Sequence, residues 1–223
     1  MSRTVTAVLF VVSVLAAGTI GFGAYRAIKT QPVPVSPPAA QPAASPEQAA
    51  VPPAAPVPEL RPVFALEDRE GRKRSITEWD GKTLVVNFWA TWCPPCRREI
   101  PMLKALSAQR AAQDVVVIGV AVDFRDQVLA YASKEGINYP LLIGEQDGLD
   151  AATAFGLGSM GLPFTVFIDR QGRIVTIHLG ELQAEQADLI VDTVLDVNRG
   201  ELSIDQAKDR IAAAMNAPEA KKS

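Results

Sequence analysis

Cysteine and histidine are scarce in this chain of 223 residues, which has two cysteines and one histidine. Two cysteines cannot form the several bridges of a small secreted disulfide scaffold. A structural zinc site takes about four cysteine or histidine ligands, so that kind of site is excluded as well. The chain also lacks an excess of basic residues, because 22 lysines and arginines stand against 25 acidic residues. We therefore do not expect nucleic acid as a partner.

Charged residues are absent from one long run at the amino terminus, residues 4–25, which lies between Arg3 and Arg26. As a helix with about 1.5 Å per residue this run would span about 33 Å, enough to cross the hydrocarbon core of a bilayer. We therefore predict a single membrane anchor within residues 1–30. A cleavable signal peptide with its cleavage site near Ala16 is the alternative. Positive charges flank both ends of the run, so they do not fix its orientation.

Two other segments differ in composition from a globular domain. Residues 31–58 contain ten prolines and eight alanines, which predicts an extended, semi-rigid linker. Residues 199–223 begin with Ser203 and Gln206 at the spacing of a capping box, which predicts a short helix that ends near Met215. We expect a disordered tail after that helix.

The remaining segment, residues 59–198, has the pattern of a globular domain in which strands and helices alternate. Apolar runs bounded by turn residues indicate strands, and apolar residues spaced by three or four positions indicate helices. This alternation predicts an α/β fold with an antiparallel hairpin at the carboxyl-terminal end of the sheet. We expect two strands within 61–79, joined by a turn at 68–71, single strands over 83–90, 115–122 and 139–144, and two strands within 164–180, joined by a turn at 169–172. We expect helices over 94–112, 126–135, 148–156 and 184–198.

Both cysteines lie in one short stretch, residues 87–101, with the sequence NFWATWCPPCRREIP. A bridge between Cys93 and Cys96 closes so small a loop that it removes little entropy from the unfolded chain, which argues against a structural role. Pro94 and Pro95 fit the first turn of a helix, so Cys93 lies at the helix amino terminus, where the dipole favours its thiolate. We therefore predict a redox-active pair. Cys93 attacks a disulfide, and the more buried Cys96 resolves the mixed disulfide.

The same stretch strongly resembles the active site of the thioredoxin superfamily. It is most similar to the TlpA, ResA and DsbE/CcmG branch, which consists of membrane-anchored bacterial thiol-disulfide oxidoreductases, and the resemblance covers roughly residues 60–198. It implies a thioredoxin fold, here with an N-terminal β-hairpin, and a central helix–strand insertion for which residues 126–147 are well placed. It also implies a single-pass protein of the cytoplasmic membrane whose domain faces the periplasm or the cell exterior.

The resemblance also implies a function, namely the reduction of disulfides in extracytoplasmic client proteins, with cytochrome c maturation as one such task. A membrane thiol protein would supply the electrons, and the cysteine pair is the only redox group that this chemistry needs, so we expect no metal and no other cofactor. A DsbA-like oxidant or isomerase is the alternative. Because the two prolines between the cysteines provide no histidine to stabilise the reduced thiolate, we favour a reductant. A copper-delivery module of the same fold fits less well, since it needs a wider cysteine spacing and a histidine ligand, and His178 is poorly placed.

Two further prolines match the branch by position. Pro101 stands where the family has a proline within the active-site helix. Pro163, in SMGLPFTVFID, stands where the family has a cis-proline opposite the dithiol, and an ordinary proline at the start of a strand is the alternative. If the Leu162–Pro163 bond is cis, the backbone of Leu162 would bind an extended segment of the client. Trp92 is expected to belong to the same docking surface.

One position departs from thioredoxin itself, which has a buried aspartate in the strand before the motif, where this chain has Asn87. Asparagine cannot transfer a proton. Glu99 lies three residues after Cys96 on the same side of the helix and matches an acid of the ResA-like branch. We predict that Glu99 takes up and returns the proton of Cys96. The alternative is a glutamate that only complements the helix dipole.

Overall fold

The computed structural model describes residues 57–157 and 161–216. The predicted anchor within residues 1–30, nearly all of the predicted linker at 31–58 and the predicted tail after residue 216 lie outside the described residues. No helix within the two described ranges is long and apolar enough to cross a membrane.

The described strands form one mixed sheet with the order β2-β1-β5-β4-β3-β6-β7. The three central strands β3, β4 and β5 run parallel, and antiparallel hairpins lie at the two edges. The strands are β1 (Ala65–Glu67), β2 (Lys73–Ser75), β3 (Thr83–Trp89), β4 (Val115–Ala121), β5 (Leu141–Ile143), β6 (Phe164–Ile168) and β7 (Ile174–Leu179).

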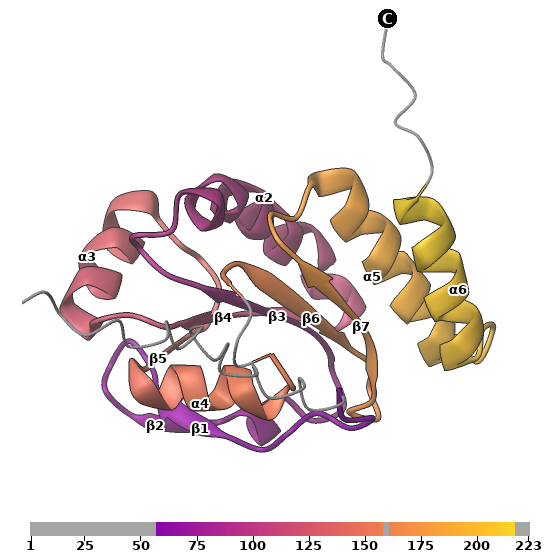
Figure 1. Cartoon of the computed structure of the whole chain (residues 1–223), viewed down its shortest axis with the longest axis horizontal. Helices are drawn as coiled ribbons and strands as arrows, with labels where there is room; N and C mark the ends of the chain where they lie inside the picture. Colours follow the sequence, from indigo (N-terminus) through magenta and orange to yellow (C-terminus); the bar gives the residue numbers. More distant parts are fainter. Residues whose placement is uncertain (1–56, 158–160, 217–223) are drawn as a thin grey trace, which may run out of the picture. The chain divides into compact units, whose positions relative to one another are not determined.

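Helices cover both faces of this sheet (Figure 1). One hydrophobic core lies between the sheet and the helices α2, α3 and α5, and the other lies between the sheet and α4. The α-helices are α2 (Pro94–Arg110), α3 (Arg125–Glu135), α4 (Gln146–Ala154), α5 (Ala184–Arg199) and α6 (Ile204–Met215). Two short 3-10 helices span Ile76–Trp79 and Ala111–Gln113.

The central strand β3 is buried along its whole length because helices cover it on both sides. Its sequence TLVVNFW is therefore a nearly continuous apolar run, as expected of a parallel strand in the middle of a sheet. Asn87 is the polar exception in the middle of the strand, and it pairs in register with Gly119 of β4. A Cβ atom at Gly119 would come within 2.7 Å of the Leu141 side chain and 3.1 Å of the indole nitrogen of Trp89, so a larger residue there would force these side chains to shift.

The elements lie where the sequence predicts them, with ends that differ by a few residues. The N-terminal hairpin turns at Asp68, whose Oδ1 accepts hydrogen bonds from the backbone N–H groups of Glu70 and Arg72. The helix–strand pair α3 and β5 follows β4, and β5 pairs with both β4 and β1 in the sheet. This pair is the central insertion that the resemblance predicts.

The carboxyl-terminal helix α6 forms at the predicted residues and begins with the predicted capping box of Ser203 and Gln206. It packs against the domain, because Ala207 and Ile211 belong to the same buried cluster as the apolar face of α5. The hydrophobic core therefore extends beyond residue 198.

Candidate active site

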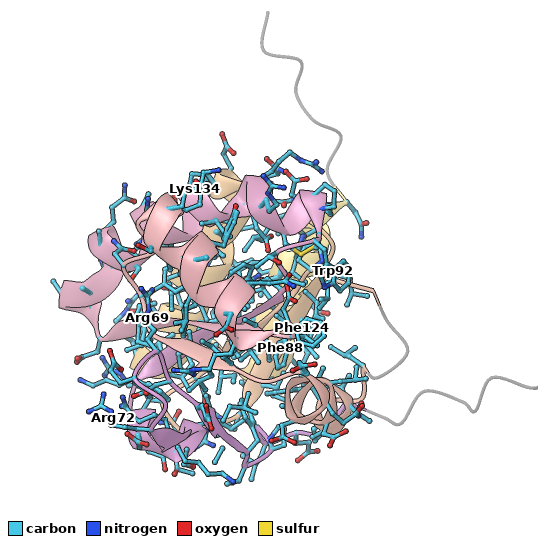
Figure 2. The ribbon with its side chains drawn as sticks, turned by 90° about the vertical axis from the view of Figure 1, so that its left-hand side faces the viewer. Arg69, Arg72, Phe88, Trp92, Phe124 and Lys134 are labelled. Carbon is cyan, nitrogen blue, oxygen red and sulfur yellow. A yellow bond between two sulfur atoms is a disulfide. The ribbon has the colours of Figure 1, made fainter. Side chains whose placement is uncertain are left out.

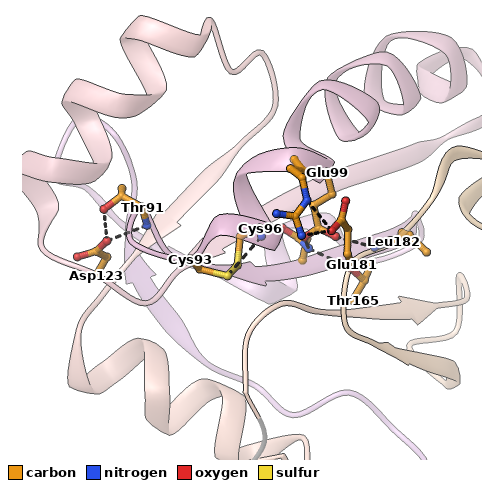
Figure 3. Close-up of a disulfide and its surroundings, with 10 residues drawn as sticks. Thr91, Cys93, Cys96, Glu99, Asp123, Thr165, Glu181 and Leu182 are labelled. Carbon is orange, nitrogen blue, oxygen red and sulfur yellow. Dashed lines mark hydrogen bonds and ion pairs between the residues drawn. A yellow bond between two sulfur atoms is a disulfide. The ribbon is translucent and has the colours of Figure 1, made fainter.

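Cys93 and Cys96 lie at the junction between the end of β3 and the start of α2, and they form a disulfide (Figure 3). Cys93 is the N-cap residue of α2, and Pro94 and Pro95 occupy the first two helical positions. Proline fits there because the first amides of a helix have no partner within it. The Sγ of Cys93 accepts a hydrogen bond of 3.3 Å from the backbone N–H of Cys96. The predicted placement of the pair at a helix amino terminus is confirmed.

Both sulfur-bearing side chains are buried, and Cys96 is completely enclosed. Cys93 retains 3% of its surface, so another disulfide can reach the pair only at Cys93. The order of burial is the one predicted for an attacking and a resolving cysteine. Trp92, directly before Cys93, is 66% exposed.

Pro163 lies beside the same end of the sheet, since Phe164 of β6 pairs with Phe88 near the end of β3. The Leu162–Pro163 peptide bond is cis, as the resemblance predicts. The carbonyl of Pro163 accepts a hydrogen bond of 2.9 Å from the backbone N–H of Gly180, which ties this loop to the end of β7. Pro101 lies inside α2, as predicted. The expected roles of Trp92 and Leu162 in client binding stay predictions.

Glu99 is buried one helical turn after Cys96, with 2% of its surface exposed. Its Oε1 accepts a hydrogen bond of 2.7 Å from the side-chain amide of Asn87, and its Oε2 accepts one of 2.9 Å from the backbone N–H of Leu182 (Figure 3). The same Asn87 nitrogen also donates to the hydroxyl of Thr165 at 3.0 Å. Asn87 therefore holds the carboxyl of Glu99 in place from the neighbouring strand.

Burial raises the pKa of Glu99 from 4.5 to about 7. The hydrogen bonds from Leu182 and Asn87 oppose this rise in pKa, and the negative charge of nearby Glu181 adds to it. A carboxyl that only complemented a helix dipole would stay ionised at the surface. With a pKa near neutral pH a carboxyl can both take up and release a proton, and the role of Glu99 toward Cys96 stays a prediction.

The sequence does not predict two contacts beside the disulfide, one an ion pair and the other a pair of hydrogen bonds to a carboxylate. Arg98 donates from Nε to the Oε2 of Glu181 at 2.9 Å, and this pair lies next to the amide of Leu182 that binds Glu99. On the other side, the Oδ2 of Asp123 accepts a hydrogen bond of 2.9 Å from the backbone N–H of Thr91 and another from its hydroxyl. These partners are distant in sequence, so only the fold brings them to the motif.

Comparison with known proteins extends over most of the described domain. The Redoxin family model matches residues 52–195. The thiol-disulfide oxidoreductase ResA of Geobacillus thermodenitrificans is 36% identical over 125 residues, which cover 56% of this chain and 70% of that protein. The thioredoxin-like protein YneN of Bacillus subtilis is 34% identical over 137 residues, which cover 59% of this chain and 76% of that protein.

Solved structures with the same fold agree with these matches. A thiol:disulfide interchange protein of the thioredoxin family from Chlorobium tepidum TLS is 31% identical, with a TM-score of 0.56. The match covers 62% of this chain and 97% of that structure. The predicted thioredoxin fold and the predicted resemblance to the TlpA, ResA and DsbE branch are thereby confirmed.

Proposed function

The chain belongs to the Redoxin family and is a thiol-disulfide oxidoreductase, and from this premise we propose that it works as a reductant of disulfides in client proteins. The observation that carries the direction is the surroundings of the Cys93 sulfur. Its hydrogen-bond donor in the described part of the chain is the amide of Cys96, because Pro94 and Pro95 have no N–H to offer. A thiolate with so few donors is only moderately stabilised, and a reduced form that is not strongly stabilised gives up its electrons readily.

The reaction proceeds by two exchanges. In the reduced protein the Cys93 thiolate attacks one sulfur of the client disulfide, forms a mixed disulfide and expels the other client sulfur as a thiolate, which takes up a proton. The Cys96 thiolate then attacks the Cys93 sulfur and releases the second client thiolate. Two electrons pass to the client, and the Cys93–Cys96 disulfide seen in the structure is the oxidised product.

Glu99 serves as the proton acceptor for Cys96 in the second exchange. The completely buried Cys96 thiol has to lose its proton before it attacks, and Glu99 lies one turn along the same helix. Protonated Glu99 needs a hydrogen-bond acceptor, and Asn87 can supply one. The Oδ1 of Asn87 is buried and has no partner among the residues described, so a half-turn of the amide brings it to the protonated carboxyl.

The setting follows from the relatives and from the amino-terminal sequence. We propose that the anchor within residues 1–30 holds the protein in the cytoplasmic membrane and that the linker at 31–58 extends the domain into the periplasm or the cell exterior. A membrane thiol protein re-reduces the cysteine pair. The clients are proteins whose disulfides must be reduced during assembly, as in cytochrome c maturation. No cofactor beyond the cysteine pair takes part, and neither the relatives nor the Cys93 surroundings favour a DsbA-like oxidant.

A single-turnover experiment with the full-length chain tests the reductive role. Prereduced protein is mixed with an excess of a disulfide-bonded protein such as insulin, and the thiols formed on the client are counted separately from those left on the prereduced protein. We expect one client disulfide reduced per Cys93–Cys96 pair. Cys93→Ser should be inactive, and Cys96→Ser should accumulate the mixed disulfide because it cannot resolve it. A prereduced wild-type protein that keeps its thiols in the presence of the client would contradict the proposal.

A further inference from the structure

The segment between β7 and α5, residues 180–182, contacts the buried carboxyl of Glu99. Charged side chains such as those of Arg72 and Lys134 lie exposed at the outside of the domain (Figure 2), whereas Glu99 is enclosed. The protonation of an enclosed carboxyl depends on the hydrogen bonds and charges next to it. The residues that contact Glu99 and those that hold these contacts therefore influence when it carries a proton.

Each residue of this segment contacts a different part of the active site. The backbone N–H of Gly180 donates to the carbonyl of the cis-proline at 2.9 Å, and that of Leu182 donates to the Oε2 of Glu99 at 2.9 Å. Between them, the Oε2 of Glu181 accepts from the Nε of Arg98 at 2.9 Å and from its Nη2 at 2.5 Å (Figure 3). The segment is thereby tied to the loop before β6 and to two adjacent residues of α2.

The two contacts with α2 differ in their exposure to solvent. The side chain of Arg98 is 60% exposed and that of Glu181 is 26% exposed, while the neighbouring contact between Glu99 and the Leu182 amide is buried. An ion pair at the surface contributes little to stability by itself. This one has a local consequence instead, because it fixes the backbone directly before the amide that donates to Glu99.

The ion pair also brings two opposite charges close to Glu99. Burial is the main cause of the raised pKa of Glu99, and the negative charge of Glu181 adds to it. Arg98 holds the pKa of Glu181 below its ordinary value, so this negative charge persists. Besides the two cysteines, the titratable groups nearby are Tyr139, whose pKa is raised by burial and by the charge of Glu99, and His178, whose Nε2 lies 3.3 Å from the carbonyl oxygen of Glu181. The contact from β3 is an uncharged amide.

We propose that Arg98 and Glu181 are positioning residues for the proton transfer to Glu99, an inference that rests on the proposed function. Their ion pair holds the amide of Leu182 against the Glu99 carboxylate and keeps the two charges beside it in balance. The proton passes from the Cys96 thiol to an oxygen of Glu99, the Cys96 sulfur attacks the mixed disulfide, and the client sulfur leaves as a thiolate. Arg98 and Glu181 neither give nor take this proton.

The test follows the attack of Cys96 directly, with an aromatic disulfide, dithiobis(nitrobenzoate), whose released thiolate absorbs light. Prereduced full-length protein and excess reagent give two releases. The Cys93 thiolate releases the first in proportion to the reagent concentration, and Cys96 releases the second at a rate independent of that concentration. In the wild type the second rate should rise with pH around an apparent pKa of about 7, and Glu99→Gln should remove this step from the pH profile.

The two charge variants should move this apparent pKa in opposite directions. Arg98→Gln leaves the negative charge of Glu181 unbalanced and loosens the segment that donates to Glu99, so the profile should shift to higher pH by roughly half a unit. Glu181→Gln removes the negative charge while its amide oxygen can still accept from Arg98, so the profile should shift to lower pH by a similar amount. Arg98→Lys keeps the positive charge and should stay close to the wild type.

Two control variants should keep the wild-type profile. Asp188→Asn is matched to Glu181→Gln, because Asp188 of α5 binds an arginine of α2 at 2.7 Å, and that arginine, Arg110, lies at the end of α2 opposite to the cysteines. His178→Gln removes the imidazole, a group that changes charge near neutral pH, and retains an N–H donor for the carbonyl of Glu181.

Three results would overturn the positioning role. They are wild-type profiles in both Arg98→Gln and Glu181→Gln, shifts of both in the same direction, and loss of the step in His178→Gln. A wild-type profile in Glu99→Gln would overturn the role of Glu99 together with this inference. Because the reagent oxidises any accessible dithiol, the opposite shifts in a protein that does not reduce insulin would support the positioning role and overturn the reductive function alone.

Discussion

Replacement of Glu99 by glutamine tests the buried proton site in the oxidised protein. The pKa of Glu99 is about 7 in the folded protein and near its ordinary value of 4.5 in the unfolded chain. Between these two pH values the folded state binds a proton that the unfolded state has already released. The free energy of unfolding therefore falls as the pH rises from about 4.5 to about 7, and the loss is complete above pH 7.

The size of this loss follows from the difference in pKa. One pKa unit corresponds to about 1.4 kcal/mol, so Glu99 alone should lower the free energy of unfolding by about 3 kcal/mol over this interval. In Glu99→Gln this dependence on pH should disappear, because glutamine does not titrate. Glutamine also keeps the local contacts, since its oxygen can accept from Leu182 while its amide donates to the Oδ1 of a turned Asn87.

Urea unfolding at pH 5 and pH 8 measures the effect in the wild type, in Glu99→Gln and in Glu185→Gln as a control. Glu185 is an exposed glutamate in the first turn of α5, so its replacement removes the same kind of group from the surface. Because the unfolded chain has already released part of this proton at pH 5, we expect Glu99→Gln to lose about 2.5 kcal/mol less than the other two proteins between the two pH values. Equal losses in all three would refute the argument that burial raises the pKa of Glu99.

Three other substitutions have expected effects that unfolding experiments can measure. Asn87→Leu removes a donor to the Glu99 carboxylate, so it should raise the pKa of Glu99 further and lower the free energy of unfolding at pH 8 by about 2 kcal/mol. Asp123→Ala leaves the amides of Thr91 and Phe124 without their acceptor, so it should lower the free energy of unfolding by about 2–3 kcal/mol. A decrease below about 0.5 kcal/mol, the size typical of a surface substitution, would contradict these contacts. Ile211→Ala should cost about 2–4 kcal/mol if α6 is part of the domain core, whereas an unchanged urea midpoint would separate α6 from it.

The fold and the sulfur chemistry are predictable from the sequence because their signals are local. The apolar run of β3, the prolines after Cys93 and the two Asp-containing turns each act over a few residues, and the structure has all of them at the expected positions. The cis bond before Pro163 is predicted through the family resemblance and not through the residues themselves.

The contacts that complete the site are not predictable in this way, because they join distant parts of the chain. Asn87 is visible in the sequence as a substitution for an acid, but its hydrogen bonds to Glu99 and Thr165 depend on how α2 and β6 pack on β3. Likewise, nothing near Asp123 in the sequence points to Thr91, which lies 32 residues earlier. Tertiary packing decides these partners.

The central claim is that the cysteine pair donates electrons to clients, and the reduction potential of the Cys93–Cys96 couple tests it most directly. The full-length chain is equilibrated in glutathione or dithiothreitol redox buffers, with thioredoxin as the reference, and the oxidised fraction is determined by thiol trapping. We predict a potential near or below that of thioredoxin, about −270 mV, since the Cys93 sulfur has few donors to stabilise its thiolate. A potential near about −120 mV would be that of a DsbA-like oxidant and would contradict the account.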